Sequence, residues 1–278
     1  MFSPPSSINS IHLYHMRIKL LVGLLIGTLF ASSCGSETSP SENTFITFPT
    51  SNTFTLRYAD FVDTTGTGRN YDSIGVIEER IVGTETVSGR TAFLHQNTLT
   101  TVGNTVSTDT TRYAYDNNNR DQWIFLSSIE DFVGDLGTFD LQGFPSGWYP
   151  YLKTSEEIGR SYTILPATPL TFQIDTLTLN ATIRATGSVR GKETISVQGR
   201  SYSTTRLVIT FTLQVRFGVI ALPDAVIDQQ VWCADNIGIV KFETTSATIG
   251  IPQLLSFTIP NTKQELLSVS NASGVSAN

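Results

Sequence analysis

Apolar and polar residues alternate with a period of two along most of the chain after residue 44. The pattern is clear in Phe54–Tyr58, Leu177–Ile183 and Leu207–Val215. Alternating segments rich in Thr, Val, Ile, Phe and Tyr are typical of antiparallel strands with one buried face and one solvated face. The pattern therefore predicts an all-β body.

Short clusters of Gly, Pro, Asn, Asp and Ser separate these segments and predict turns. They are Gly66–Asn70, Ser88–Gly89, Asp116–Asn119, Pro145–Gly147 and Gln198–Gly199. Their spacing predicts a meander of about ten or more strands, in one strongly curved antiparallel sheet or half-barrel, or in two packed sheets. Only Ser128–Leu136 has helical character, so we expect at most one short helix.

An internal similarity indicates that the body consists of two duplicated β units. Gly83–Phe93 matches Gly191–Tyr202, in which two extra residues precede Gly199, and Asp109–Asp116 is similar to Asp228–Asp235 in the same order. Chance similarity among Thr-rich strands is the alternative. The two expected units are residues 44–140 and 141–278, and both one continuous sheet and two lobes remain open.

A different pattern precedes the body. Arg17 and Lys19 are followed by the apolar run Leu20–Phe30 and then by small residues up to Cys34. A positive region, an apolar region and a small-residue cleavage site are the parts of a signal peptide. The apolar run has about half of the roughly 20 residues that a membrane-spanning helix needs. We therefore expect residues 1–33 to be a leader.

Ala31-Ser32-Ser33-Cys34 resembles the lipobox of bacterial lipoproteins, with Ala31 where Leu is usual. The resemblance implies that Cys34 becomes the N-terminus and carries acyl chains such as palmitate. Two or three acyl chains would anchor the chain firmly, since each buried CH₂ contributes about 0.8 kcal/mol. The alternative is an ordinary signal peptide with an accidental cysteine at this position.

The leader and the tether have distinct expected bounds. The chain is expected to begin at Met16, because residues 1–15 fit no part of a leader, so residues 16–33 would be the signal peptide. Residues 34–43 would be the acylated cysteine and a small, polar, flexible tether. Gly35 follows the cysteine in place of the acidic residue that retains some lipoproteins at the inner membrane, which favours the outer membrane.

Charge and cysteine content exclude several classes of protein. Removal of residues 1–33 takes away two cations and no carboxylate, which lowers the formal charge from −6 to −8. An acidic body argues against nucleic-acid binding and against electrostatic docking on anionic lipid. With Cys34 acylated, Cys233 is the only cysteine left, so no intramolecular disulfide can form.

The second unit resembles a pattern in uncharacterised exported bacterial β-proteins. In Val231–Glu243 a Trp-containing strand turns through Gly-Ile-type residues into a strand that carries Lys241, and Gly191–Ile195 precedes it. Those proteins look related to the curved-sheet lipoprotein carriers of the bacterial envelope, whose half-barrel holds acyl chains. Asn236 stands where Gly is commoner in the pattern. The resemblance implies a fold, and no site residue is carried across.

The mature chain offers few reactive side chains. His95, its only histidine, is expected at a surface or partly packed position on a strand, without a Gly-x-Ser-x-Gly motif nearby. Together with Cys233 it supplies two of the three or four ligands that a zinc site needs. The adjacent acids Glu78 and Glu79 would point to opposite faces of a strand and are expected to be solvated, like the Glu156–Glu157 pair.

Three further motifs are expected to be structural. Asp63–Gly66 departs from the Asp-Thr-Gly of aspartic proteases by one inserted residue. Asp116–Asp121 predicts a hairpin turn and not a calcium loop, because Arg120 stands where a ligand oxygen is needed. A group of aromatic side chains is expected to pack in the core before it forms any sugar- or lipid-facing surface. These aromatics are Trp123, Trp148, Tyr149, Tyr151 and Trp232.

The sequence therefore predicts a lipid-anchored envelope protein without enzymatic activity, metal or cofactor. Its curved sheet is expected to bind lipid or another hydrophobic molecule on a concave apolar face. Its partners would be the membrane, reached through Cys34, and a hydrophobic small molecule or an envelope protein. The alternative is a surface-displayed structural or protein-interaction module without a ligand cavity. Mutation of His95 to Ala is expected to leave any activity intact.

Overall fold

The structure is a computed structural model that describes residues 46–63, 65–128, 140–174, 177–217, 220–251 and 255–271. The chain divides into the units Met1–Ser39 and Pro40–Asn278, and every described residue belongs to the second unit. The leader, Cys34, the tether and most of the expected helix at 128–136 lie outside the described residues. Within those residues, no helix is long and apolar enough to cross a membrane.

The described chain is built from sixteen strands. They are β1 (Phe54–Asp63), β2 (Tyr71–Val87), β3 (Arg90–Thr101), β4 (Val106–Asp116), β5 (Asp121–Leu126), β6 (Asp140–Gln142), β7 (Gly147–Lys153), β8 (Ser161–Ile174), β9 (Leu177–Val197), β10 (Arg200–Phe217), β11 (Ile220–Ala221), β12 (Ala225–Ala234), β13 (Gly238–Thr244), β14 (Ala247–Ile251), β15 (Leu255–Ile259) and β16 (Thr262–Asn271). The expected all-β fold class is confirmed.

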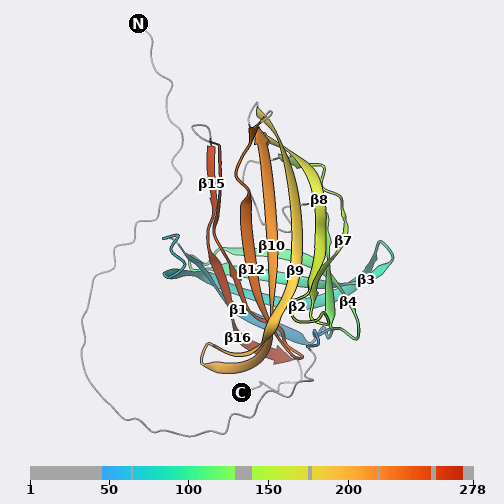
Figure 1. The fold of residues 1–278 in the computed structure, drawn as a ribbon. Helices are drawn as coiled ribbons and strands as arrows, with labels where there is room; N and C mark the ends of the chain where they lie inside the picture. Colours follow the sequence, from blue (N-terminus) through green and yellow to red (C-terminus); the bar gives the residue numbers. More distant parts are fainter. Residues whose placement is uncertain are drawn as a thin grey trace, which may run out of the picture. The chain divides into compact units, whose positions relative to one another are not determined.

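Fourteen of these strands form one antiparallel sheet. Its order is β6-β8-β9-β10-β12-β13-β16-β1-β2-β3-β4-β5-β7, with β11 paired to β10 off this path, and β14 and β15 form a separate hairpin. The long strands β8, β9, β10 and β12 run side by side, while β1 to β4 cross them at a steep angle (Figure 1). The sheet is therefore strongly curved, which is one of the two arrangements that the spacing of the turns predicted.

The alternating pattern gives the sheet its buried face. On β10, the apolar residues Leu207, Ile209 and Phe211 are at most 2% exposed, whereas Gln214 between two later apolar positions is exposed. Successive side chains of a strand point to opposite faces, so a single-phase apolar run buries one face completely. These residues belong to a large aliphatic core that also includes residues of β8, β9 and β12.

The β2–β3 and β9–β10 hairpins, which the sequence predicts to be related, have the same type of turn and the same skipped residue in their ladders. Ser88–Gly89 and Gln198–Gly199 both have positive φ at each residue, 48° and 79° in the first and 50° and 77° in the second. Such pairs make the tight turns whose twist matches a hairpin. The ladder skips one residue directly before Gly83 and again directly before Gly191. The strands of both expected units lie in one continuous sheet, and the duplication itself stays a prediction.

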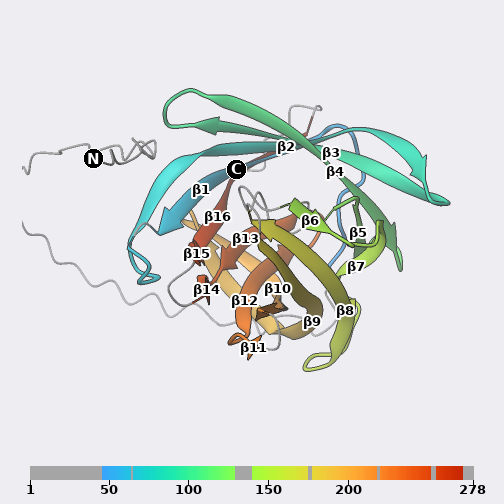
Figure 2. The same ribbon diagram turned by 90° about the horizontal axis from the view of Figure 1, so that it is seen from above.

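The two ends of the sheet approach each other where β7 returns toward β8 (Figure 2). The ladder does not continue between them, and a side chain bridges the gap. The hydroxyl of Tyr162 on β8 donates to the carbonyl oxygen of Tyr151 on β7 at 2.8 Å and accepts from the N–H of Lys153 at 3.2 Å. Burial raises the pKa of Tyr162 well above its ordinary value, so this hydroxyl keeps its proton and remains a donor.

Gly187 makes room for this bridge. It lies directly opposite Tyr162 in the β8–β9 register, and a Cβ built on it would come within 2.2 Å of the Cζ atom of Tyr162. Real carbon atoms do not approach that closely, so any larger residue would displace the tyrosine ring. A strand glycine at a site of close approach is thus required for the tyrosine to lie across the sheet.

Replacement of Tyr162 by Phe tests this bridge. The change leaves a strand-edge N–H and a carbonyl oxygen without their partner, so we expect the free energy of unfolding to fall by about 1–3 kcal/mol. Urea unfolding followed by circular dichroism measures it. Tyr202→Phe is the matched control, since the Tyr202 hydroxyl makes no hydrogen bond in the described part of the chain. Equal losses in the two variants would contradict the bridge.

Candidate functional site

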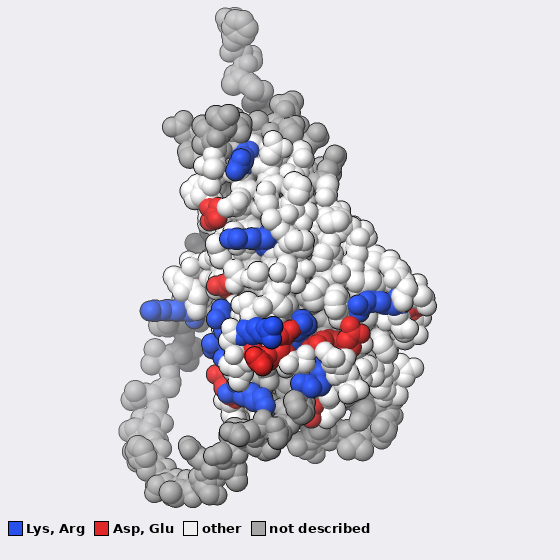
Figure 3. All heavy atoms as spheres, turned by 45° about the vertical axis from the view of Figure 1, so that its right-hand side comes forward, with Lys and Arg blue, Asp and Glu red and all other residues white. Residues whose placement is uncertain are grey.

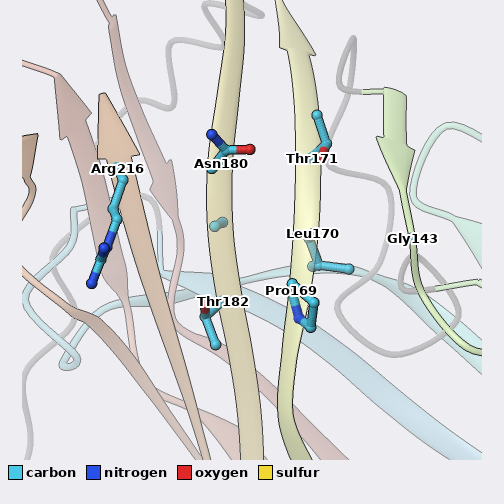
Figure 4. Close-up of a pocket in the computed structure, with 8 residues that line it drawn as sticks. Gly143, Pro169, Leu170, Thr171, Asn180, Thr182 and Arg216 are labelled. Carbon is cyan, nitrogen blue, oxygen red and sulfur yellow. The ribbon is translucent and has the colours of Figure 1, made fainter. Parts of the chain in front are cut away.

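A hollow of about 780 Å³ lies at the end of β8, β9 and β10 (Figure 4). This volume is within the range of about 300–1,000 Å³ that is typical of small-molecule sites. Its lining residues are Gly143, Pro169, Leu170, Thr171, Asn180, Ala181, Thr182 and Arg216. The hollow therefore combines apolar residues with uncharged polar residues and one cation.

The antiparallel register puts the polar lining residues into rows across the strands. Asn180 of β9 lies opposite Arg216 of β10 on one side and opposite Thr171 of β8 on the other. Directly opposite residues share a face of the sheet, so these three side chains form one row. Figure 4 shows Asn180 between Arg216 and Thr171. Thr182 lies opposite Pro169 in the next row on the same face.

The apolar part of the lining belongs to the edge of the core. Leu170 is 3% exposed and Ala181 is 5% exposed, and Leu170 extends toward the segment of Gly143 in Figure 4. Gly143 has φ of +94°, and a Cβ there would lie 3.3 Å from the carbonyl oxygen of Pro169. Glycine thus permits both the left-handed backbone and the close approach of this segment to β8.

A second hollow of about 410 Å³ lies against β1, β2 and β3. Its lining is rich in threonine and includes Arg57 and Glu78, whose Nε and Oε2 atoms are 3.9 Å apart. The cation and the acid neutralise each other there. The hollow on β8–β10 differs because its arginine has no acid among the lining residues, and it is therefore the stronger candidate for a ligand site.

Residues before the first strand cover part of the apolar core in the described part of the chain. Ile46 and Phe48, which precede the first strand, pack into the aliphatic core together with residues of β7 to β10 and β12. Within the described residues, ligand-sized space is found at the hollows described above.

A cluster of polar side chains lies in the interior under β2 to β5. The Nδ1 atom of His95 is 2.5 Å from Oε1 of Glu79, and its Nε2 atom is 2.9 Å from the hydroxyl of Tyr115. The Nε2 atom of Gln122 lies 3.4 Å from the same hydroxyl. His95 and Gln122 are each only 5% exposed, and the side chain of Glu79 is 22% exposed.

The cluster is joined by hydrogen bonds from Glu79 through His95 and Tyr115 to Gln122. Burial, with a smaller contribution from the charge of Glu79, raises the pKa of Tyr115 well above its ordinary value, so its hydroxyl keeps its proton. The tautomer of His95 decides which partner donates in its two hydrogen bonds. The amide of Gln122 donates to the Tyr115 hydroxyl, and its Oε1 atom has no hydrogen-bond partner among the described residues.

Two of the sequence-based expectations fail at this cluster. His95 is buried and not at a surface or partly packed position, and Glu79 is bonded to it and not solvated. The expectation that Glu78 and Glu79 point to opposite faces holds, since the side chain of Glu78 is 46% exposed beside Arg57. The interior of this part of the sheet contains hydrogen-bonded polar side chains. The alternating pattern identifies apolar residues as buried, so it could not predict that these polar residues are buried as well.

Asp63 stabilises a turn. Its carboxylate accepts hydrogen bonds from the N–H and hydroxyl of Thr65, from the N–H groups of Gly66 and Gly68, and from the side-chain amide of Asn261. These donors, the Thr65 hydroxyl first, hold the pKa of Asp63 well below its usual range although burial opposes them. Both oxygens of the Asp63 carboxylate accept hydrogen bonds that hold the turn together. This structural role is the one expected from a motif that departs from the Asp-Thr-Gly of aspartic proteases.

The asparagine run between β4 and β5 forms the predicted hairpin turn. Asn117, Asn118 and Asn119 have φ of 52°, 57° and 62°, the left-handed region that asparagine tolerates better than most residues. Asn236, in the turn between β12 and β13, has φ of 56° and lies in the same left-handed region.

The aromatic residues do not form a common surface. Trp232 is 6% exposed in a second apolar cluster, and Tyr149 and Tyr151 pack against the main core. The indole N–H of Trp148 donates to the carbonyl oxygen of Val87 at 2.9 Å, and the guanidinium of Arg90 lies 4.1 Å from the ring centre of Trp123. The expectation that these side chains pack in the protein is therefore confirmed for Trp232.

Cys233 is a free, fully buried thiol, and burial raises its pKa well above the ordinary value. In the described part of the chain, no group of three or more His, Cys, Asp and Glu residues is placed to hold a metal ion. The residues that line the hollow on β8–β10 were not singled out from the sequence. Only the register across three strands brings Arg216, Asn180 and Thr171 together.

Comparison with known proteins gives likenesses of fold. No family model matches the chain, and no curated protein matches it. The structure is similar to that of a proposed lipoprotein from Parabacteroides distasonis, with 8% identity, a TM-score of 0.48 and coverage of 82% of this chain and 100% of the other. It is also similar to a proposed exported protein with YmcC-like fold from Bacteroides fragilis, with 9% identity, a TM-score of 0.45 and the same coverage.

A third likeness is to the hypothetical lipoprotein YmcC from Escherichia coli, with 11% identity, a TM-score of 0.33 and coverage of 77% of this chain and 83% of the other. All three are described as lipoproteins or exported proteins, the class that the sequence resembles. At these identities and TM-scores, the likenesses carry no argument about function.

A double-mutant cycle tests the polar cluster. His95→Leu leaves the Glu79 carboxylate and the Tyr115 hydroxyl without partners, so we expect it to lower the free energy of unfolding by about 2–4 kcal/mol. The double variant with Glu79→Leu should lose less than the sum of the single losses, by about 0.5–3 kcal/mol. Additive losses in urea unfolding would contradict the coupling. Gln96→Leu, at the next and outward-facing position of β3, is the control.

Proposed function

We propose that the chain is an exported lipoprotein of the cell envelope whose β body binds a small amphipathic molecule in the hollow on β8–β10. The observation that carries the proposal is the lining of this hollow. Pro169 offers apolar contact on the same face as Asn180 and Arg216, which offer polar contact, and the hollow has a volume of about 780 Å³. Leu170 and Ala181 line it from the edge of the buried core. A site with both kinds of lining is suited to a molecule with a hydrocarbon part and a polar head.

The proposed anchor is supported by the sequence before the body. A positive region, an apolar run and small residues lead to Cys34, as in the leaders of lipoproteins. The twelve residues from Cys34 to residue 45 could span at most about 40 Å, so an acylated chain would keep its body close to the membrane surface.

The body holds the start of the described chain firmly. Thr47 donates to Oδ1 of Asp235 from its N–H at 3.0 Å and from its hydroxyl at 2.7 Å. Ile46 and Phe48 on either side of it are buried in the core. The segment that follows the proposed tether is thus fixed to the turn between β12 and β13, which favours a role for this end of the body as the point of attachment.

Replacement of Cys34 by Ser tests the anchor. The variant cannot be acylated, so we expect it to move from the membrane fraction to the soluble envelope fraction and to lose metabolically incorporated palmitate. Cys233→Ala is the control and should stay in the membrane fraction with its label, because Cys233 lies in the body. A wild-type chain that is soluble and unlabelled would contradict the anchor and would indicate an ordinary signal peptide.

Filling the hollow tests ligand binding. In a full chain that carries Cys34→Ser, Thr182→Trp should weaken the binding of dodecanoate and of the neutral dodecyl maltoside by roughly tenfold or more, because the indole occupies the space of either ligand. Isothermal titration calorimetry below the micellar concentration measures both. Thr186→Trp, on the same face of β9 but outside the lining, should leave both affinities unchanged. Failure of both amphiphiles to bind the unfilled protein would contradict the proposal.

A surface-displayed interaction module is the second candidate. It is favoured by the large aliphatic core within the described part of the chain and by an apolar hairpin tip. Val102 and Val106, at the turn between β3 and β4, are 72% and 61% exposed. This candidate would replace the first if the titrations show no amphiphile binding.

A further inference from the structure

We propose that the row formed by Arg216, Asn180 and Thr171 binds an anionic head group, a carboxylate or a phosphate, of the amphipathic ligand. The inference rests on the proposed function, because it identifies the chemistry of the molecule that would occupy the same hollow. It adds the charge of the ligand and the residues that recognise it.

The geometry of the row suits an anion. Neighbouring strands are about 4.8 Å apart, so three directly opposite residues on β10, β9 and β8 span about 10 Å. A guanidinium, a side-chain amide and a hydroxyl can all donate hydrogen bonds, and the row contains no carboxylate. The row thus offers donors from three strands on one face, and a cationic head group would be repelled by the guanidinium.

Arg216 is an exposed arginine that forms no ion pair within the described part of the chain, and Arg184 is another. Some arginines of the sheet are paired with acids, for example Arg57 with Glu78 and Arg206 with Glu193. On the same face of β10, Gln214 already donates to the carboxylate of Asp224 at 3.1 Å. The guanidinium of Arg216 is therefore available to a ligand.

The surface around the long strands carries few charges. Figure 3 shows charged side chains gathered in a band over the lower half of one face, whereas the upper half is mostly uncharged. The protein as a whole is acidic, with a formal charge of −6, so long-range attraction does not favour anions. Recognition of an anion must come from local contacts, and the planar fork of arginine is the side chain best suited to bidentate contact with carboxylate or phosphate.

The same hollow offers contact for the rest of the molecule. Pro169 lies on the same face as the row and offers apolar contact there, and the segment of Gly143 lies against it. Leu170, the next residue, lines the hollow from the edge of the buried core. A free inorganic anion would use only the row, whereas an anion that carries a hydrocarbon chain would use both parts of the lining. The lining therefore favours an acidic amphiphile over a free anion.

Arg216→Ala in the full chain with Cys34→Ser tests the inference. Four probes are titrated by calorimetry: dodecanoate, dodecyl phosphate, neutral dodecyl maltoside and inorganic phosphate. We expect the variant to bind the two acidic amphiphiles roughly tenfold or more weakly, because a charge-assisted hydrogen bond is lost, and to bind dodecyl maltoside as before. Inorganic phosphate should bind the unsubstituted row more weakly than dodecyl phosphate does.

Arg184→Ala is the matched control. Arg184 is an exposed arginine on the same face of β9, opposite Thr212, and it does not line the hollow. Its removal changes the net charge equally and should leave all four affinities unchanged. If both variants bind the acidic amphiphiles equally weakly, or if Arg216→Ala binds them as tightly as before, the row does not bind the anionic head group. The proposal that the hollow binds an amphiphile would remain.

The remaining outcomes separate the inference from the proposed function. Inorganic phosphate that binds as tightly as dodecyl phosphate, and depends on Arg216, would overturn the amphipathic ligand. No binding of any amphiphile to the protein with Arg216 intact would overturn both proposals.

Discussion

The hydrogen bonds of the Tyr162 hydroxyl hold together the two ends of an otherwise open sheet. A fourteen-stranded sheet has two edges with unpaired N–H and carbonyl groups, which are a liability unless they are covered. Here β8 covers the edge at β7 with one side chain, and Gly187 provides the space that the ring needs. The contact lies beside the aliphatic core, in which Leu152 of β7 and Ile164 of β8 are both buried, and β8 also lines the hollow.

The two halves of the sheet have different interiors: one is aliphatic, and the other contains hydrogen-bonded polar side chains. The β2–β3 and β9–β10 ladders each skip one residue, directly before Gly83 and directly before Gly191. His95 and Leu207 hold equivalent positions in the two ladders, because each pairs with the residue that precedes the skipped one. Leu207 is fully buried among aliphatic side chains, whereas His95 is hydrogen-bonded to Glu79 and Tyr115. Buried polar groups are costly unless they are paired, so this half depends on a continuous chain of hydrogen bonds.

Local features of the sequence predicted the local structure well. The period of two predicted the strands and their buried faces, and turn chemistry predicted the turns at Ser88–Gly89 and Asp116–Asn119, where the structure has left-handed residues. The burial of His95 and the row of Arg216 with its neighbours could not be predicted, because both depend on which strands are paired and in what register. Alternation fixes which residues share a face of one strand, but it does not fix their neighbours on the next strand.

Native mass spectrometry with organic extraction, applied to the chain purified from a bacterial envelope, tests the central claim most directly. The polar row beside apolar residues predicts one molar equivalent of a co-purified molecule with an acidic head and a hydrocarbon part. A chain that carries no such molecule in any preparation, and whose mass remains that of the protein alone after incubation with acidic amphiphiles, would contradict it.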